Sequence, residues 1–436
     1  MDQINLERRG IPSVTILTQP FIGLAGTIAL AEIDAELCSV AVPHPLGMIP
    51  APEVRKKADD AFPAILKAAT EWQQPVKSQT NSPVYPAERF EIAGTVEDVN
   101  RQLFDKGWSL GLPVIPPTTE RVGGMLKGTS RKPDEVIGQV PPRMGSLTIE
   151  LVAANAVMAG CKPEYMPLLV VALEALLSPE ADWRSALATT GTSQSVVIVN
   201  GPIISRIGLA CQQGAAGKGH HANATIGYAI NLIAYNVGGS RPPSIDKSTL
   251  GSPGDFVCWV FGENEAELPS GWQPLHVERG FAKSDSVVTV MVSYPPINNL
   301  DHWSATPEEH LRYWSHVINP LQNAGGPCQP IVMKQNPILA VGPEHAQLLA
   351  SAGWNKDDLK EALWTQARIP LSDLPAGCSH AGQLTDILGP ITSKTMLPII
   401  ARAEQFLIAI AGGDGKHSHY FPPFPGCFPV SKPVSE

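Results

Sequence analysis

The stretch IPSVTILTQPF, residues 11–21, decides the fold expected for the start of the chain. Its first eight residues are mostly apolar or β-branched and predict a strand, and Pro20 leads into a small-residue helix over roughly 21–31. A second strand is predicted over 39–42, followed by a helix over about 52–72 with a proline in its first turn. The order β-α-β-α is typical of a parallel sheet, here half of a flavodoxin-like unit. Two strands are too few to form a stable sheet, so we expect strands from elsewhere in the chain or from a partner.

The remainder of the chain predicts a larger α/β domain with buried helices. Residues 73–92 are rich in Gln, Ser, Pro and Asn and predict a linker between an N-terminal unit over 1–72 and a large domain over 93–436. Helices are expected over 96–106 and 119–126. The segments 149–161 and 163–177 are apolar on all sides, which indicates buried helices.

Composition excludes several classes of protein. The 436 residues carry a net charge of -9 and no basic stripe, which argues against nucleic-acid binding. The longest apolar runs, such as 168–177, are too short to cross a bilayer, and the first nine residues do not resemble a signal peptide. The seven cysteines are scattered, odd in number and never in a CxxC pair. A cytoplasmic location in a reducing compartment is therefore expected.

Three apolar runs end in glycine-containing turns, at 196–200, 338–341 and 406–411. Each resembles a buried strand whose carboxyl end opens into a turn, and ligands bind at that edge of open α/β sheets. Three ordinary buried strands with no shared site would give the same pattern.

The strongest local signal for a ligand site is the Gly-rich stretch 211–227, which leads into a helix starting near Asn223. Free N–H groups at a helix start attract an anion, and glycines such as Gly219 let the backbone approach a ligand. Asn223 and Thr225 are therefore substrate-binding candidates. His220 is a candidate acid or base, and Cys211 is a nucleophile if its pKa is lowered. Because His220 and His221 point differently, at most one of them faces a site; a structural crossover is the alternative.

Residues 276–280 form a second constellation. In an extended chain His276 and Glu278 lie on one face and Arg279 on the other. His276 and Glu278 then suit acid–base work, and Arg279 suits binding of a substrate carboxylate. His276 is also a substrate-binding candidate. A salt-bridged strand end is the alternative reading.

A third constellation follows the last apolar run. His417 and His419 have the i, i+2 spacing that places two metal ligands on one face of a strand. A site needs at least one more ligand, and the candidates are Glu150, Cys161, Glu278 and His220. No cofactor is firmly implied. A divalent metal is expected only if His417 and His419 form a metal site with a third ligand.

Two isolated residues complete the set. Glu150 is a carboxylate in an otherwise apolar helix, which makes it a substrate-binding candidate or a core hydrogen-bonding group. His44 stands between two prolines at the end of a strand. There it can serve a partner thiol as acid or base, or it is simply a loop residue.

The segments LERRGIPSVTILTQPF and VPHPLGMIPAPEVRKKADDAFPAIL resemble the C-terminal half of the UGSC-type (seleno)protein domain. That domain is similar to the B-component selenoproteins of glycine and proline reductases. In those proteins a selenocysteine or cysteine motif lies just upstream of the strand that matches 11–18. No such residue stands there in this chain. Either the sequence is truncated or the motif arrives on a separate small subunit, and the half-sheet favours the second expectation.

The rest of the chain, about 95–425, resembles a family often encoded with that domain. The matching segments include TTGTSQSVVIVNGPI, ANATIGYAINLIAYNVGG and WQPLHVERGF. This resemblance implies a shared fold and no particular reaction.

We expect the large subunit of a hetero-oligomeric enzyme, with the site between the two units. A cysteine or selenocysteine of a small partner would cleave or form a carbon–heteroatom bond in a small anionic substrate. A metal-assisted hydratase, lyase or hydrolase and a non-catalytic binding or maturation subunit are the alternatives.

Overall fold

The fold was analysed in a computed structural model that describes residues 2–33, 36–47, 49–72, 85–320, 328–374 and 381–435. It contains helices and several small sheets and belongs to the α/β class, as predicted. We refer to the described residues 2–72 as the N-terminal unit and to 85–435 as the large unit.

The N-terminal unit contains a parallel pair of strands, β1 (Thr15–Thr18) and β2 (Ser39–Val42). They alternate with the helices α1 (Asp2–Arg8), α2 (Ile22–Ile33) and α3 (Ala51–Glu71). The β-α-β-α order is confirmed, and α1 precedes it without having been predicted. No third strand joins β1 and β2 among the described residues.

Apolar side chains of the N-terminal unit remain exposed on several elements. In β2, Val40 and Val42 are buried, while Ile16 of β1 is 50% exposed. None of the described side chains of α3 is buried, and Phe62 and Leu66 on this helix are 62% and 53% exposed. Such a surface matches the prediction of a small sheet that is not self-sufficient.

The large unit is built on two four-stranded sheets. The first has the order β14-β7-β5-β6 and the second the order β12-β9-β13-β8. The pairs β5–β6 and β9–β12 are parallel, and the other pairs are antiparallel. The strands of the first sheet are β5 (Gln194–Asn200), β6 (Trp259–Gly262), β7 (Val287–Ser293) and β14 (Val430–Pro433). Those of the second are β8 (Ile297–Leu300), β9 (Ile338–Val341), β12 (Leu407–Ile410) and β13 (His417–Phe421).

The two sheets pack face to face between two layers of helices. Val196 and Ile198 of β5 join the apolar cluster between the sheets, whereas Val197 and Val199 join the cluster beneath the helices. The second sheet divides its side chains in the same way, between the cluster that lies between the sheets and the cluster beneath its own helices. This follows because successive side chains of a strand point to opposite faces of the sheet. Burial of both faces explains why these strands are continuous apolar runs rather than alternating ones.

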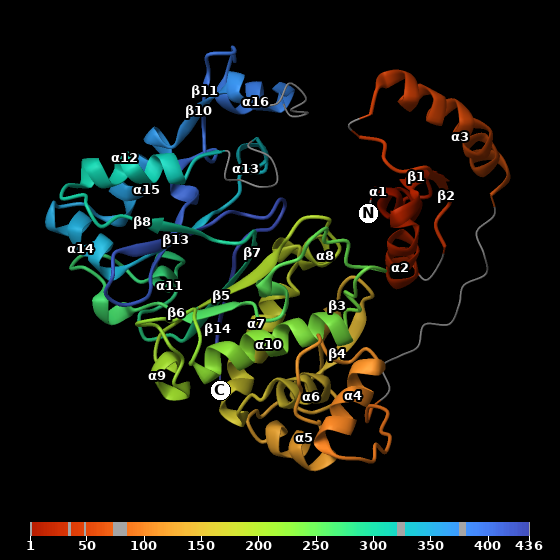
Figure 1. The fold of residues 1–436 in the computed structure, drawn as a ribbon, viewed down its shortest axis with the longest axis horizontal. Coiled ribbons are helices and arrows are strands. Elements are labelled where there is room, and N and C mark those ends of the chain that lie inside the picture. The colour runs from red at the N-terminus through yellow and green to blue at the C-terminus, as the bar shows by residue number, and fades with distance from the viewer. Residues whose placement is uncertain are drawn as a thin grey trace.

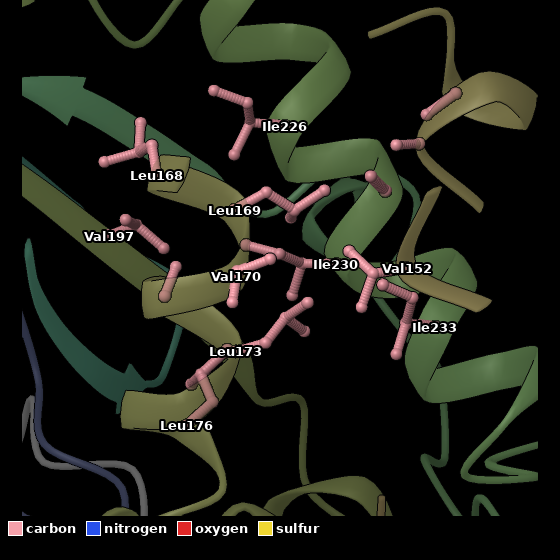
Figure 2. Close-up of a cluster of buried hydrophobic side chains, with 14 of the residues drawn as sticks. Val152, Leu168, Leu169, Val170, Leu173, Leu176, Val197, Ile226, Ile230 and Ile233 are labelled. Carbon is pink, nitrogen blue, oxygen red and sulfur yellow. The ribbon is translucent and has the colours of Figure 1, made fainter. Parts of the chain in front are cut away.

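The helices of the first layer include α6 (Ile149–Ala159), α7 (Met166–Leu176) and α10 (His221–Asn236). Figure 2 shows how their Leu, Ile and Val side chains meet Val197 of β5 in one buried cluster. The burial predicted for the helices within 149–161 and 163–177 is confirmed, since most residues of α6 and α7 are buried. The helices of the opposite layer include α12 (Pro307–Val317), α14 (Pro343–Ser351) and α15 (Lys356–Gln366).

Shorter elements complete the large unit. Its remaining helices are α4 (Val96–Asp105), α5 (Thr119–Leu126), α8 (Trp183–Leu187), α9 (Ile203–Ile207), α11 (Leu275–Glu278), α13 (Gln329–Val332) and α16 (Ala381–Leu388). Two antiparallel pairs lie outside the main sheets, β3 (Val136–Val140) with β4 (Gly145–Thr148) and β10 (Arg368–Pro370) with β11 (Met396–Pro398). None of the helices in the described part of the chain has the length and apolar character needed to span a membrane.

The two units are joined by few described contacts. Residues 73–84 of the predicted linker lie outside the described residues, whereas 85–92 are described without helix or strand. The Phe90 ring lies 4.9 Å from that of Trp108, so the end of this segment packs on the large unit. Glu32 of α2 forms an ion pair with Arg184 of α8. Figure 1 shows the N-terminal unit, in red, on the side of the molecule away from β6, β8 and β13.

Candidate functional site

A cavity of about 410 Å³ lies at the interface of the two main sheets and brings together two of the predicted constellations. One wall is the Gly-rich loop 213–217, and the opposite wall is the 411–415 turn. Its sides are Trp259 and Phe261 of β6 together with His417, His419 and Phe421 of β13. Each set has a spacing of two, so it projects from a single face of its strand. We call this space the inter-sheet cavity.

The cavity lies at the carboxyl ends of two parallel strands. β9 and β12 are neighbours in the second sheet, and Ala340 and Ala411 at their ends line the cavity. Two of the three predicted strand-turn segments therefore meet at one site. The third ends at Gly201, whose N–H donates to Glu265 at 2.8 Å and which does not line the cavity.

The 411–415 turn is held by polar groups that were not predicted from the sequence. Asn264 donates from its backbone N–H to Ile410 O at 2.7 Å and from Nδ2 to Gly412 O at 2.9 Å. Gly412 in turn donates to Cys211 O at 2.9 Å, which ties the turn to the Gly-rich loop. The neighbouring Glu263 is 1% exposed and accepts the Ile410 N–H. The sequence signal was a Glu-Asn pair directly after the apolar run of β6.

His419 is the titratable group best placed for chemistry in the cavity. Its ring lies beside those of Trp259 and Phe421, with centroid distances of 6.1 and 6.4 Å. Burial, and then the nearby His417, lower the pKa of His419 below its ordinary value. A neutral imidazole at neutral pH can accept a proton from a substrate and return it.

His417 lies nearer the cavity mouth and is exposed. Its Nδ1 is 3.0 Å from Asn298 Oδ1, and its ring lies 5.3 Å from that of His302 in an edge-on arrangement. His302 was not among the predicted residues.

Backbone N–H groups give the cavity donors for an anion. The N–H groups of Gly214, Ala216, Gly413 and Asp414 make no hydrogen bond within the described residues. Free backbone amides in such loops can bind carboxylates and oxyanions. Asp414 is the one carboxylate in the lining, and no lysine or arginine belongs to the described lining.

The two histidines of the Gly-rich stretch point to different partners, as predicted. His220 precedes α10, and its Nε2 lies 3.3 Å from Gln213 O in the cavity loop. His221, the first residue of α10, lies with Nδ1 3.2 Å from Tyr165 Oη. His220 therefore supports the loop from outside the described lining. Gly219 has a φ of +94° and open space around its Cα, so it serves the turn without touching the cavity.

Cys211 does not meet the condition set for a nucleophile. Burial, followed by the negative charge of Glu265, raises the pKa of its thiol instead of lowering it. A thiolate would need the opposite environment. Its backbone carbonyl, which accepts the Gly412 N–H, is what connects this residue to the site.

Asn223 and Thr225 are directed away from a substrate. Asn223 is 4% exposed, and its Nδ2 lies within 3.0 Å of the carbonyls of Ala210, Ala215 and Val260. Its Oδ1 accepts the Ala210 N–H at 2.9 Å, so both Nδ2 donors and the amide oxygen are engaged by the backbone. Thr225 donates back to His221 O within α10. Asn223 fixes the loop onto the helix, whereas the Thr225 hydroxyl bonds within the helix.

The predicted extended conformation of residues 276–280 is wrong. Pro274 starts the short helix α11, which removes the alternation assumed for His276 and Glu278. Glu278 pairs with Lys356 at 2.8 Å and Lys360 at 3.2 Å.

Arg279 and His276 of this segment are not available to a ligand in the inter-sheet cavity either. Arg279 donates to Ser431 Oγ and to Pro429 O, holding the start of β14. His276 is fully buried, 3.8 Å from Glu265. None of the segment lines the inter-sheet cavity.

Glu150 and His44 are also placed outside the cavity. Glu150 accepts from Ala87 N at 2.9 Å and Arg89 Nη2 at 3.3 Å, so it anchors the end of the predicted linker to α6. This agrees with the hydrogen-bonding alternative. His44 is exposed, with Nδ1 3.2 Å from Thr18 Oγ1, at the carboxyl edge shared by β1 and β2.

The predicted third metal ligand is not found beside His417 and His419. Glu150, Glu278 and His220 have the partners given above, and Cys161 is buried with a pKa raised to about 12, mainly by desolvation. No group of three His, Cys, Asp or Glu side chains suited to a metal occurs within the described ranges. A site between the two units stays a prediction. All described residues that line the cavity belong to the large unit.

Comparison with known proteins gives a match for the N-terminal unit. No curated protein and no solved structure matches the chain significantly. Residues 1–71 match the model of the UGSC family, which supports the resemblance seen in the sequence for this part of the chain.

Proposed function

We propose that this chain is the large subunit of a heteromeric enzyme that converts a small anionic substrate in the inter-sheet cavity. The observation that carries the proposal is the meeting of the 213–217 loop, the 411–415 turn and His419 around one cavity. Free backbone amides suit a carboxylate or a developing oxyanion, and a neutral histidine suits proton transfer. Trp259 and Phe421 supply an apolar wall beside His419.

The thiol chemistry of the proposal comes from the N-terminal unit. Its family match, together with the resemblance to reductase B components, points to a cysteine or selenocysteine on a small partner. As a nucleophile, the thiolate would displace the heteroatom from the substrate carbon, so that a carbon–sulfur or carbon–selenium bond forms while the carbon–heteroatom bond breaks and the heteroatom leaves with its electron pair. The open flanks of β1 and β2 offer the partner a place to add strands, and His44 at their carboxyl edge is the candidate to activate the thiol. Because no described residue of 2–72 lines the cavity, the partner must also reach the large unit.

Capture of the partner tests the heteromeric part of the proposal. The tagged chain is purified from its native source and the complex is analysed by mass spectrometry. A small polypeptide with cysteine or selenocysteine is expected, and Ile16→Glu on β1 is expected to release it. Val96→Glu, which places the same charge at a 64% exposed site of the large unit, is the matched control. A complex without such a polypeptide, or one that both variants release equally, contradicts the partner model.

Metabolite profiling tests the catalytic part. The purified complex is incubated with a small-molecule extract, and consumed compounds are identified by mass spectrometry. Compounds consumed by the wild type and by His316→Gln, an exposed histidine at the end of α12, should persist with His419→Gln. Equal consumption by His419→Gln would exclude His419 as acid or base. No consumption by any form would favour the non-catalytic subunit.

The metal-assisted alternative makes a separate prediction. His417 and His419 both line the cavity, so water or substrate would have to complete their coordination. Metal analysis of the purified chain decides between the models. Stoichiometric metal that is lost in His419→Ala would replace the thiol mechanism.

A further inference from the structure

A second and larger cavity of about 630 Å³ lies elsewhere in the large unit and shares no lining residue with the inter-sheet cavity. It is open to solvent on one side and is lined by α8, the start of β5, the end of α10 and the loop 246–256. None of the residues predicted from the sequence as functional lines it. We call it the loop-covered cavity.

The charge in this cavity is negative. Two carboxylates line it, Asp246 and Asp255, and its described lining includes no lysine, arginine or histidine. Asp246 Oδ1 accepts from Ser248 N at 2.8 Å and Ser248 Oγ at 2.7 Å, and Asp255 Oδ2 accepts from Ser252 N at 2.6 Å. The second oxygen of each carboxylate makes no hydrogen bond within the described residues. Burial, opposed in part by the Ser252 N–H and reinforced by the charge of Asp246, raises the pKa of Asp255.

Aromatic and hydroxyl groups accompany the carboxylates. Trp183, at 3% exposure, and the half-buried Tyr235 are among the residues that line the cavity. Aromatic faces attract organic cations, especially beside carboxylates. The Arg241 guanidinium lies 5.0 Å from the Tyr235 ring centroid and is not part of the lining.

A buried hydroxyl is also left for a ligand. Ser195 on β5 lines the cavity and is 4% exposed, yet its hydroxyl has no hydrogen-bond partner within the described part of the chain. The oxygen is not fully enclosed, so it is open to the cavity and can hydrogen-bond to a group that enters there. This observation is independent of the carboxylates.

We propose that the loop-covered cavity binds a small organic ammonium ion, with Asp246 and Asp255 as its counter-charges and the Ser195 hydroxyl as a polar contact. An anion would meet two carboxylates without a compensating base. A bare divalent metal ion would find two carboxylates and no third charged or imidazole ligand in the described lining. The volume fits an organic cation of metabolite size.

Titration calorimetry of the full chain tests this site. The probes are choline, n-butylammonium and 3,3-dimethyl-1-butanol, the uncharged carbon isostere of choline. At least one of the two cations should bind saturably. If choline binds, its affinity should be about tenfold or more higher than that of its uncharged isostere. Failure of both cations to bind, or equal binding of choline and its isostere, overturns the proposal.

Variants locate the binding. Asp255→Asn should weaken binding of the cation by about tenfold or more, because it removes a counter-charge while keeping the acceptor for Ser252 N. If that variant does not fold, Asp246→Asn carries the same expectation. Asp414→Asn, in the inter-sheet cavity, is the matched control and should bind as the wild type does. Binding that is lost in Asp414→Asn, or kept in the folded Asp246 or Asp255 variant, overturns the assignment.

Discussion

Glu263→Gln probes a buried carboxylate that connects the two main sheets beside the inter-sheet cavity. Glu263 follows β6 of the first sheet and accepts the N–H of Ile410 in β12 of the second. The Glu263 carboxylate is 1% exposed. Its Oε2 accepts from Asn200 Nδ2 at 2.6 Å and Leu275 N at 2.7 Å, and its Oε1 accepts from Ile410 N at 3.1 Å. Lys356 Nζ lies 3.6 Å from Oε1. Glutamine has nearly the same shape but only one acceptor oxygen.

The cost follows from the hydrogen bonds that glutamine cannot make. If the oxygen of the glutamine side chain keeps the hydrogen bonds from Asn200 Nδ2 and Leu275 N, its NH₂ group faces the Ile410 N–H. Two hydrogen-bond donors then point at each other. A buried donor left without a partner costs about 1–3 kcal/mol. Lys356 keeps Glu278 at 2.8 Å and so retains one counter-charge, which limits the further loss to roughly 1 kcal/mol. We therefore expect the free energy of unfolding to fall by about 2–4 kcal/mol.

Urea denaturation followed by tryptophan fluorescence measures this loss. Glu267→Gln, an exposed carboxylate four residues away, is the matched control and should change stability by less than about 0.5 kcal/mol. Combining Glu263→Gln with Lys356→Met should be non-additive by about 1 kcal/mol, since both residues share one network. A Glu263→Gln variant as stable as the Glu267→Gln control would refute the reasoning.

Three further predictions concern other buried groups. Burial is the main reason why the pKa of His345 is lowered from 6.5 to about 4 in the folded chain. As pH falls below 6.5, this histidine is therefore protonated in unfolded chains before it is protonated in folded ones. Stability should therefore drop by about 3 kcal/mol between pH 6.5 and 4, and His345→Gln should remove that part of the pH dependence in denaturation curves. Asn223→Ala should cost about 2–4 kcal/mol by leaving several backbone groups unpaired, and unchanged thermal stability would contradict its structural role. Cys211 should react with iodoacetamide more slowly than a cysteine in an unfolded peptide, as followed by mass spectrometry; faster reaction would restore it as a nucleophile.

Local patterns were sufficient for many elements of the fold. The predicted strands 39–42 and 338–341 and the helix 119–126 agree with β2, β9 and α5 residue by residue. In each case turn-forming or capping residues next to the element mark where it begins or ends. The first strand is shorter than predicted, since residues 11–14 precede β1 without pairing.

Long-range pairing could not be predicted. β5 and β9 are apolar on both faces, so no alternation in the sequence shows that their side chains divide between two cores. Arg279 finds its partner Ser431 on a strand 152 residues later. The short helix α11 depends on contacts of this kind more than on its own sequence, which explains the wrong prediction of an extended segment.

Only part of the site could be predicted, because the rest of it depends on long-range contacts as well. Glycine-rich turns and paired histidines are visible in the sequence, and the structure brings the 213–217 loop to His417 and His419. The polar side chains of Asn223, Glu278 and Arg279 looked equally available, because the sequence does not show which buried partners occupy them. Their saturation by nearby groups is a property of the folded chain alone.

The most direct test of the account is whether a small anion binds in the inter-sheet cavity. Saturation-transfer NMR of the full chain with acetate, glycolate and pyruvate measures this, using Ala411→Leu to fill the cavity and Ala352→Leu, an exposed alanine, as the matched control. The account predicts a saturable signal from at least one of these anions with the wild type and Ala352→Leu, and its loss with Ala411→Leu. Absence of binding to the wild type, or binding that persists in Ala411→Leu, would contradict it.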